Sequence, residues 1–454
     1  MATLKPTARK YVREVFAALE PKIAEKTASP TGMPRWQGLD GGTLFVLRQE
    51  TLSPEEWTLI DELHRVSGLP ESGLMDAALR SDSRTARLLG KMVGTPLMSG
   101  QMDEESLKRS LLWAVLRAGG VSLRFSEDAF ERGYDEWLKA TLARTQTSVF
   151  LAPVSLQLSE PLDLGDGVEL AQMDDDEVSA CLTMGAIQLV LPGMTGTAFV
   201  GNRAAIRLTF DVPRGPTEDF SDEDQAKAIE AESAAFESAQ GVVQALRLFQ
   251  RGRVSIGGHV LLRGDGSMQG GPYRSPLFPQ QDELVLSEPQ EFRAFLELFR
   301  AALRKNRTMA AVARRFGYAG ERPRRDDEIV DLVSSLEGLL LSDIRRGAEY
   351  RFRTAIRGAL FIDGSGLTAR EVKKQLIRGY DVRSAVAHGG TPSESDLKSA
   401  NGESLTLDEF VEGIEELVRL AVRKAIECVG AGNGWPPDWD ALALEGASYP
   451  AADA

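Results

Sequence analysis

The segment Tyr380–Gly390 places an arginine and a histidine, Arg383 and His388, five residues apart at the end of a predicted helix. The chain has three histidines in 454 residues, and neither His64 nor His259 has a basic residue at the same offset. Arginine binds phosphate oxygens through a planar fork of donors, and histidine exchanges a proton near neutral pH. The pair therefore has the chemistry to cut a phosphodiester without a metal ion. A helix-end histidine beside a surface arginine is the simpler alternative.

Two helices are expected before this pair. Residues 326–346 carry acids in the first turn and then apolar side chains at helical spacing, with Glu337 beside the apolar stripe. Residues 350–361 form a second helix that is rich in arginine. These two helices are the elements that would have to position the Arg-x4-His pair.

Capping boxes predict where the next two helices begin. Thr368 and Glu371 open the helix that carries the pair, and the glycines 389–390 close it. Thr406 and Glu409 open a fourth, long helix with an apolar face. The sequence therefore predicts a bundle of helices over this part of the chain.

This order of elements resembles the Apea-like HEPN domain of the HEPN superfamily. The resemblance spans residues 310–430 and rests on the acidic start that runs into Ser335–Leu340, the arginine-rich second helix and the segment Tyr380–Gly389. It implies a small helical bundle that pairs as a homodimer. In many members it also implies a metal-independent ribonuclease whose Arg-x4-6-His motifs meet across the dimer interface. By that resemblance we expect Arg383 and His388 to be catalytic, with Glu337 at an acidic position near the site.

Two positions differ from family members that are known as active or as modified toxins. Ser384 follows the motif arginine where active members often have Asn, Asp or His, but its hydroxyl still forms hydrogen bonds and we expect it in the site. The alternative is a catalytically inactive HEPN module that dimerises or binds RNA. Gly390 stands where some HEPN toxins carry a tyrosine that a partner enzyme modifies, so that mode of control is not expected.

The spacing of the pair favours a dimeric site. RNA supplies its own nucleophile, the 2′-hydroxyl, so cleavage needs a base, an acid for the leaving 5′-oxygen and positive charge for the phosphorane. Five helical residues turn by about 500°, which leaves the two side chains about 140° apart and about 7.5 Å apart along the axis. One chain is poorly arranged to supply all three functions, whereas a two-fold axis brings a second copy of the same surface.

A basic segment precedes this region. Residues 300–325 contain nine Lys and Arg residues against the single acid Glu321, although the whole chain has a net charge of −14. This favours a surface that follows RNA phosphates, with Phe316 and Tyr318 stacking on unpaired bases. A solvated helix face is the alternative. The residues expected to bind nucleic acid are Arg314, Arg315, Arg322, Arg324 and Arg325, together with Tyr380.

Other patterns are weaker. Asp363 followed by Glu371-Val372-Lys373 matches a loose metal-nuclease signature, but that signature needs a strand and this one lies in a predicted helix. Cys181 and Cys428 are too few for a zinc site. We therefore expect no metal and no cofactor. The run from Gly264 to Pro279 reads as a loop or linker.

Length and composition indicate the number of domains and the general class of protein. A chain of 454 residues with 43% hydrophobic and 26% charged residues is expected to form two or three globular domains. The net charge of −14 argues against a general nucleic-acid coat protein. The sequence shows no apolar run that would span a membrane, no signal peptide and only two cysteines, so we expect a cytoplasmic protein without membrane partners.

The expected fold class is α+β, with an all-α HEPN helical bundle preceded by a mixed helical and β-containing N-terminal region. Residues 1–147 read as mainly helical, 148–285 as mixed α/β, 286–430 as the HEPN helical domain and 431–454 as an irregular tail. The predicted function is an RNA endonuclease in bacterial anti-phage defence or toxin-like growth arrest. The N-terminal region is expected to sense a phage-derived or nucleic-acid trigger, or to recruit RNA. A scaffold in which the Arg/His pair is structural is the third alternative.

Overall fold

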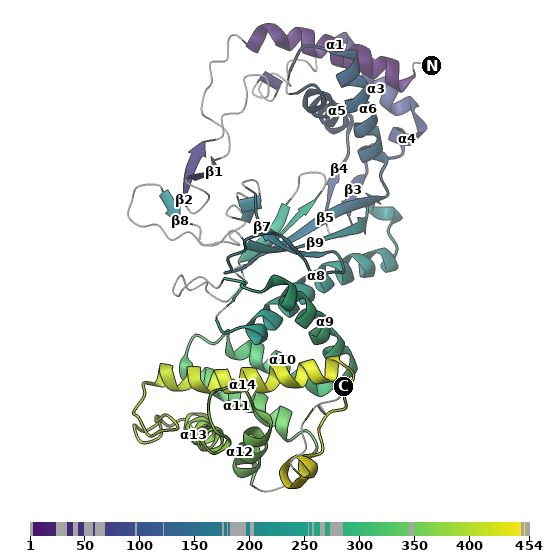
Figure 1. The fold of residues 1–454 in the computed structure, drawn as a ribbon. Coiled ribbons are helices and arrows are strands. Elements are labelled where there is room, and N and C mark those ends of the chain that lie inside the picture. Colours follow the sequence, from purple (N-terminus) through teal and green to yellow (C-terminus); the bar gives the residue numbers. More distant parts are fainter. Residues whose placement is uncertain are drawn as a thin grey trace.

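The fold was obtained as a computed structural model, and it is α+β, as predicted. Helices at the N-terminus lead into an antiparallel sheet, and the chain from residue 289 to residue 430 is built from helices (Figure 1). The structure describes residues 3–23, 34–39, 44–49, 58–59, 69–95, 98–120, 122–174, 177–178, 180–181, 197–199, 204–252, 254–256, 258–263, 268–272, 285–344, 349–445 and 449.

The N-terminal helices pack around a hydrophobic core of their own, which includes Val12, Leu111 and Trp137. Gly133 lets two of them approach closely, since a Cβ there would lie 2.6 Å from the Cα of Val115. The helices are α1 (Leu4–Ile23), α3 (Pro70–Ser81), α4 (Ser83–Ala86), α5 (Glu104–Ala118) and α6 (Glu127–Leu142).

Short strands accompany these helices, so the prediction of a mainly helical segment 1–147 was incomplete. They are β1 (Pro34–Leu39), β2 (Leu44–Gln49), β3 (Met92–Thr95) and β4 (Met98–Gln101). β1 pairs with β2 and β3 pairs with β4, and later strands extend both sheets, as β8 (Thr197–Phe199) joins β2 and β10 (Gly215–Pro216) joins β3.

The central sheet has the order β12-β11-β5-β9-β7-β6, and every neighbouring pair is antiparallel. These strands agree with the mixed α/β character predicted for residues 148–285, whereas β12 lies inside the run expected to be a loop or linker. Gly270 explains the difference: a Cβ there would lie 2.2 Å from the carbonyl oxygen of His259 on β11, so this glycine permits strand pairing. The strands are β5 (Thr145–Pro153), β6 (Leu162–Asp163), β7 (Val168–Gln172), β9 (Ala204–Pro213), β11 (Gly258–Arg263) and β12 (Met268–Pro272).

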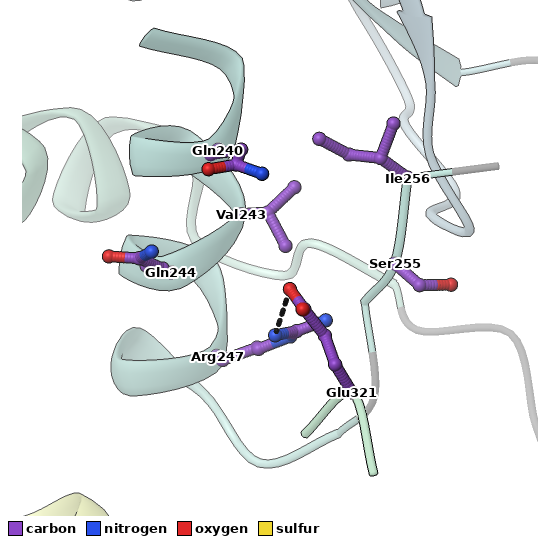
Figure 2. A pocket seen from close by; sticks show the side chains of 7 residues that line it. All are labelled: Gln240, Val243, Gln244, Arg247, Ser255, Ile256 and Glu321. Atoms are coloured by element: carbon purple, nitrogen blue, oxygen red, sulfur yellow. Dashed lines mark ion pairs between the residues drawn. The ribbon is translucent and has the colours of Figure 1, made fainter. Parts of the chain in front are cut away.

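The long helix α8 (Asp222–Phe249) lies between the sheet and the C-terminal helices (Figure 1). Near its end, the buried Arg247 donates from Nε to the carbonyl of Val254 at 2.7 Å and from Nη1 to the carbonyl of Gly317 at 2.7 Å. Nη1 also lies 3.6 Å from Glu321 Oε1, across a small cavity lined by both residues (Figure 2). Arg247 thus ties α8 to the end of α10.

The C-terminal helices correspond closely to those predicted, and both capping boxes are present at Thr368/Glu371 and Thr406/Glu409. Gly358 permits the close packing of α12 on α13, since a Cβ there would lie 2.3 Å from Leu376 Cδ1. The helices are α9 (Pro289–Lys305), α10 (Arg307–Ala319), α11 (Arg325–Leu340), α12 (Tyr350–Phe361), α13 (Ala369–Ala387) and α14 (Leu407–Gly430).

The described part of the tail has little regular secondary structure, and aromatic packing holds it against the helices. Trp435, Trp439 and Tyr449 surround the ring of Phe361 at centroid distances of 5.3, 6.1 and 6.3 Å. The large apolar area of these rings stabilises a segment whose Gly- and Pro-rich composition does not favour a long helix or a strand. One π-helical turn, Ala441–Glu445, follows.

A single hydrophobic core runs from the sheet through α8 into the C-terminal helices. It includes Phe150 and Ile206 on the strands, Leu246 on α8, and Phe292 and Val418 on the helices that follow. The boundary expected at residue 285 therefore separates two segments that share one core. In the described ranges, none of the helices combines the length and the apolar character that crossing a membrane requires.

Candidate functional site

The end of α13 determines where the motif histidine stands. His388 is the C-cap residue, and Gly389 adopts a φ of +77°. The N–H of Gly389 donates to the carbonyl of Val386 at 2.9 Å, and that of Gly390 donates to Ala385 at 2.8 Å. This is the Schellman arrangement, in which glycine takes the left-handed position at the lowest cost. The glycine pair thereby fixes His388 at the exposed end of the helix.

Helix α11 brings Glu337 to the motif arginine. Glu337 Oε2 lies 3.5 Å from Arg383 Nη2, and Tyr380 forms a side-chain hydrogen bond with Glu337. The guanidinium carbon of Arg383 lies 5.7 Å from the centroid of the Tyr380 ring. The structure therefore brings together three of the residues that the sequence had singled out.

Burial and neighbouring groups act in opposite directions on the pKa of the acid in this cluster. Burial raises the pKa of Glu337, while the charge of Arg383 and the hydrogen bond from Tyr380 oppose that rise. Burial, followed by the nearby Glu337 charge, raises the pKa of Tyr380. The acid is thus held in a partly buried position where its ionised form depends on Arg383.

Arg383 keeps unused hydrogen-bonding capacity. Its Nε is buried and has no partner among the described residues, and the 3.5 Å contact with Glu337 is long for an N–H···O bond. By contrast Arg325, which is also largely buried, binds Glu328, Asp408 and Glu412. Phosphate oxygens match the donors of a guanidinium in number and geometry. Arg383, whose side chain is 28% exposed against 16% for Arg325, is the better suited of the two to receive an anion through its outer nitrogens.

Ser384 and His388 stand apart from the Glu337–Arg383 contact. Ser384 is partly exposed, and its carbonyl accepts the N–H of His388 at 3.2 Å. Within the described residues, no hydrogen bond or ion pair joins the imidazole of His388 to Glu337 or Arg383. This agrees with the helical spacing, which separates positions 383 and 388 by about 140°.

Sequence reasoning did not select Arg351 and Asp381, which form an ion pair beside the site. Arg351 lies in the first turn of α12, and its charge acts on Tyr380. The arginine-rich start of the second helix was the available signal. The position of Arg351 next to α13 depends on how α12 packs on α13.

The basic segment 300–325 is largely neutralised by acids. Arg315 and Arg322 bind the two oxygens of the buried Asp331 at 2.8 and 2.6 Å, and Arg324 binds Asp326 at 2.6 Å. Most of these acids follow residue 325, so the charge counted in the segment alone overstates the positive surface. Arg314 is exposed on α10.

Of the two aromatic residues expected to stack on bases in that segment, Phe316 is 2% exposed and packs in the core, so the expectation for it was wrong. Its place on the apolar face of α10 is the reason, because every residue on that face turns inward. Tyr318 is 44% exposed. Its proposed contact with RNA stays a prediction.

The rival metal-nuclease residues are dispersed. Asp363 pairs with Lys424 at 2.7 Å, Glu371 caps α13, and Lys373 lies 5.0 Å from the ring of Phe352. Over the residues that the structure describes, no three His, Cys, Asp or Glu side chains gather as metal ligands would.

The remaining histidines and the cysteines have structural surroundings where they are described. His259 lies on β11, as predicted, and stacks on Phe150 at 5.5 Å, while burial lowers its pKa. Cys181 and Cys428 are buried free thiols. His64 lies outside the described residues.

No family model, no curated protein and no solved structure matches this chain. The assignment of a function therefore depends on the residues of the site and on their arrangement.

Proposed function

We propose that the chain is a HEPN-type RNA endonuclease that cleaves without a metal ion, with Arg383 and His388 as its catalytic residues. The observation that carries the proposal is the position of the Arg383 guanidinium. Glu337 and Tyr380 hold it near the end of α13, while the side chain stays 28% exposed and its ion pair with Glu337 is long, at 3.5 Å. His388 follows five residues later at an exposed helix end.

The reaction proceeds by attack of the RNA 2′-oxygen on the adjacent phosphorus. One imidazole removes the proton of the 2′-hydroxyl, the P–O5′ bond breaks, and a second imidazole protonates the leaving 5′-oxygen. The products are a 2′,3′-cyclic phosphate and a 5′-hydroxyl. The guanidinium of Arg383 stabilises the negative charge of the phosphorane. Because each chain offers one such histidine, the two imidazoles come from a homodimer whose two-fold axis passes beside the ends of both α13 helices.

The other residues of the cluster position these groups. Glu337 orients Arg383 from α11, Tyr380 holds Glu337, and the Ser384 hydroxyl lies on the motif helix where it can contact the RNA backbone. The N-terminal region senses a trigger or recruits RNA, as fits a cytoplasmic defence system or a growth-arrest toxin.

Incubation of the purified protein with transfer RNA and total RNA in EDTA tests the proposal. Cleavage should persist and leave 2′,3′-cyclic or 3′-phosphate ends. Arg383→Ala and His388→Ala should each lower the cleavage rate on the order of 10²-fold or more while the protein stays folded and dimeric. Arg370→Ala, an exposed arginine on the same helix, is the matched control and should cleave normally. Full activity in both motif variants would reduce the pair to a structural helix end.

The second candidate is a catalytically inactive HEPN module that binds RNA or dimerises. Ser384 favours it, because active members of the resembling family often carry Asn, Asp or His there. RNA binding without any cleavage would support this candidate over the nuclease, provided that neither Arg383→Ala nor His388→Ala changes the binding or the dimer.

A further inference from the structure

One face of α13 carries a row of side chains that leads to the motif histidine. Positions 373, 377, 381, 384 and 388 follow the spacing of a single helical stripe, within about 80° of one another. They are Lys373, Ile377, Asp381, Ser384 and His388. The row extends over about 22 Å along the helix, which is room for several nucleotides of an extended strand.

The start of α12 lies over the same stripe. Arg351 forms an ion pair with Asp381, and Lys373 Nζ lies 5.0 Å from the centroid of the Phe352 ring. Phe352 is nevertheless 52% exposed. Arg353 is exposed as well, and among the described residues it forms no ion pair. An exposed aromatic ring therefore lies next to Lys373, with Arg351 and Arg353 on either side of it in the sequence, near the stripe that ends at His388.

We propose that this surface, made of Phe352, Arg351, Arg353 and Lys373, binds single-stranded RNA and guides it to His388. An unpaired base stacks on the open side of the Phe352 ring, and the basic side chains contact the phosphates on either side of it. Base–aromatic stacking tolerates any sequence, because every base presents a π-face. The inference rests on the proposed function and assigns the substrate class and its entry path.

Charge decides against a second copy of the chain as the occupant. A two-fold contact through this surface would bring the cations of both chains together, with Asp381 already paired to Arg351. An RNA strand instead supplies one negative charge for each nucleotide. Double-stranded RNA fits less well, since its bases are stacked within the duplex and are not open to Phe352.

Fluorescence anisotropy with a labelled single-stranded RNA carrying 2′-O-methyl groups measures binding without cleavage. Phe352→Ala should weaken binding about tenfold, the size expected for losing one base stack, while Phe352→Trp should restore it. Lys373→Ala should reduce the slope of log affinity against log salt by about one. Ile229→Ala removes an apolar side chain of similar exposure, 54%, on α8 and should bind like the original protein.

Unchanged affinity in Phe352→Ala, or no binding of single strands by the original protein, would overturn the inference. Equally tight binding of duplex RNA with the same dependence on Phe352 would also overturn it. So would loss of dimer formation in Phe352→Ala, measured by sedimentation. The last would assign the surface to self-association. Cleavage of RNA with normal binding in Phe352→Ala would defeat this inference and leave the nuclease standing. Binding that depends on Phe352, without any cleavage, would support this inference and count against the nuclease.

Discussion

Gly389 offers a sharp test of the proposal that the end of α13 positions His388 for catalysis. Its φ is +77°, and a Cβ added there would meet nothing within 4 Å. The cost of Gly389→Ala is therefore conformational and not steric. A non-glycine residue in the left-handed region loses about 1–2 kcal/mol, so that is the expected fall in the free energy of unfolding if the cap keeps its shape.

Gly364 provides a matched control. It lies in the loop between α12 and α13, its φ is +70°, and a Cβ there would also meet nothing within 4 Å. Gly364→Ala should therefore cost the same stability without disturbing His388. If the Gly389→Ala cap relaxes to another shape instead, the population with the original His388 position falls by up to about thirtyfold for a cost of about 2 kcal/mol, since 1.4 kcal/mol is a factor of ten.

Guanidinium unfolding followed by circular dichroism measures the stability of both variants, and initial cleavage rates on a labelled RNA measure activity. Gly389→Ala should cleave several-fold more slowly than Gly364→Ala. Gly389→Asn should recover part of the rate, because asparagine tolerates the left-handed region better than alanine does. Equal cleavage rates for the two alanine variants would refute the argument that this turn places His388.

Three further predictions follow from the packing. Glu337→Gln should change the pH dependence of stability. Burial raises the pKa of Glu337, so the folded protein holds this proton more tightly than the unfolded chain does. The original protein should therefore lose stability relative to the variant as the pH rises from the ordinary pKa of 4.5 through the raised pKa. A melting-temperature difference that stays constant with pH would contradict this. Arg247→Met should lower the free energy of unfolding by about 3 kcal/mol in denaturant titrations, because it leaves the buried carbonyls of Val254 and Gly317 without this donor; a loss below about 1 kcal/mol would show that other groups replace it. Burial raises the pKa of Cys181 to about 12 and that of Cys428 to about 11, so neither thiol should react with a disulfide reagent at pH 8 until the protein is unfolded, and rapid labelling of the folded protein would count against their burial.

The helices of the C-terminal half could be predicted because their signals are local. The Thr368/Glu371 and Thr406/Glu409 boxes form as the sequence indicates, and the glycines after His388 end α13. These features depend on residues three or four positions apart. The α+β class was predicted from the same kind of local signal, because segments with strand-like alternation precede segments with helical spacing.

The features that were missed depend on distant partners. The strand β12 exists because β11 pairs with it, and the tail is held by Phe361, which lies more than 70 residues earlier. In the site, Glu337 was selected by resemblance, but its contact with Arg383 depends on the packing of α11 on α13. The carboxylates that neutralise the basic segment lie largely beyond it, so no count within residues 300–325 could reveal them.

The shared core has a consequence for how this chain can be divided or recombined. A C-terminal fragment cut at residue 286 would leave behind α8 and the sheet, and the faces of α9, α10 and α14 that pack on α8 would become solvent-exposed. The smallest transplantable unit therefore begins near β5, at residue 145, and carries the sheet with it. The N-terminal helices have a core of their own, but β2 pairs with β8 and β3 pairs with β10, so an exchange at residue 145 would also remove the partners of those two later strands.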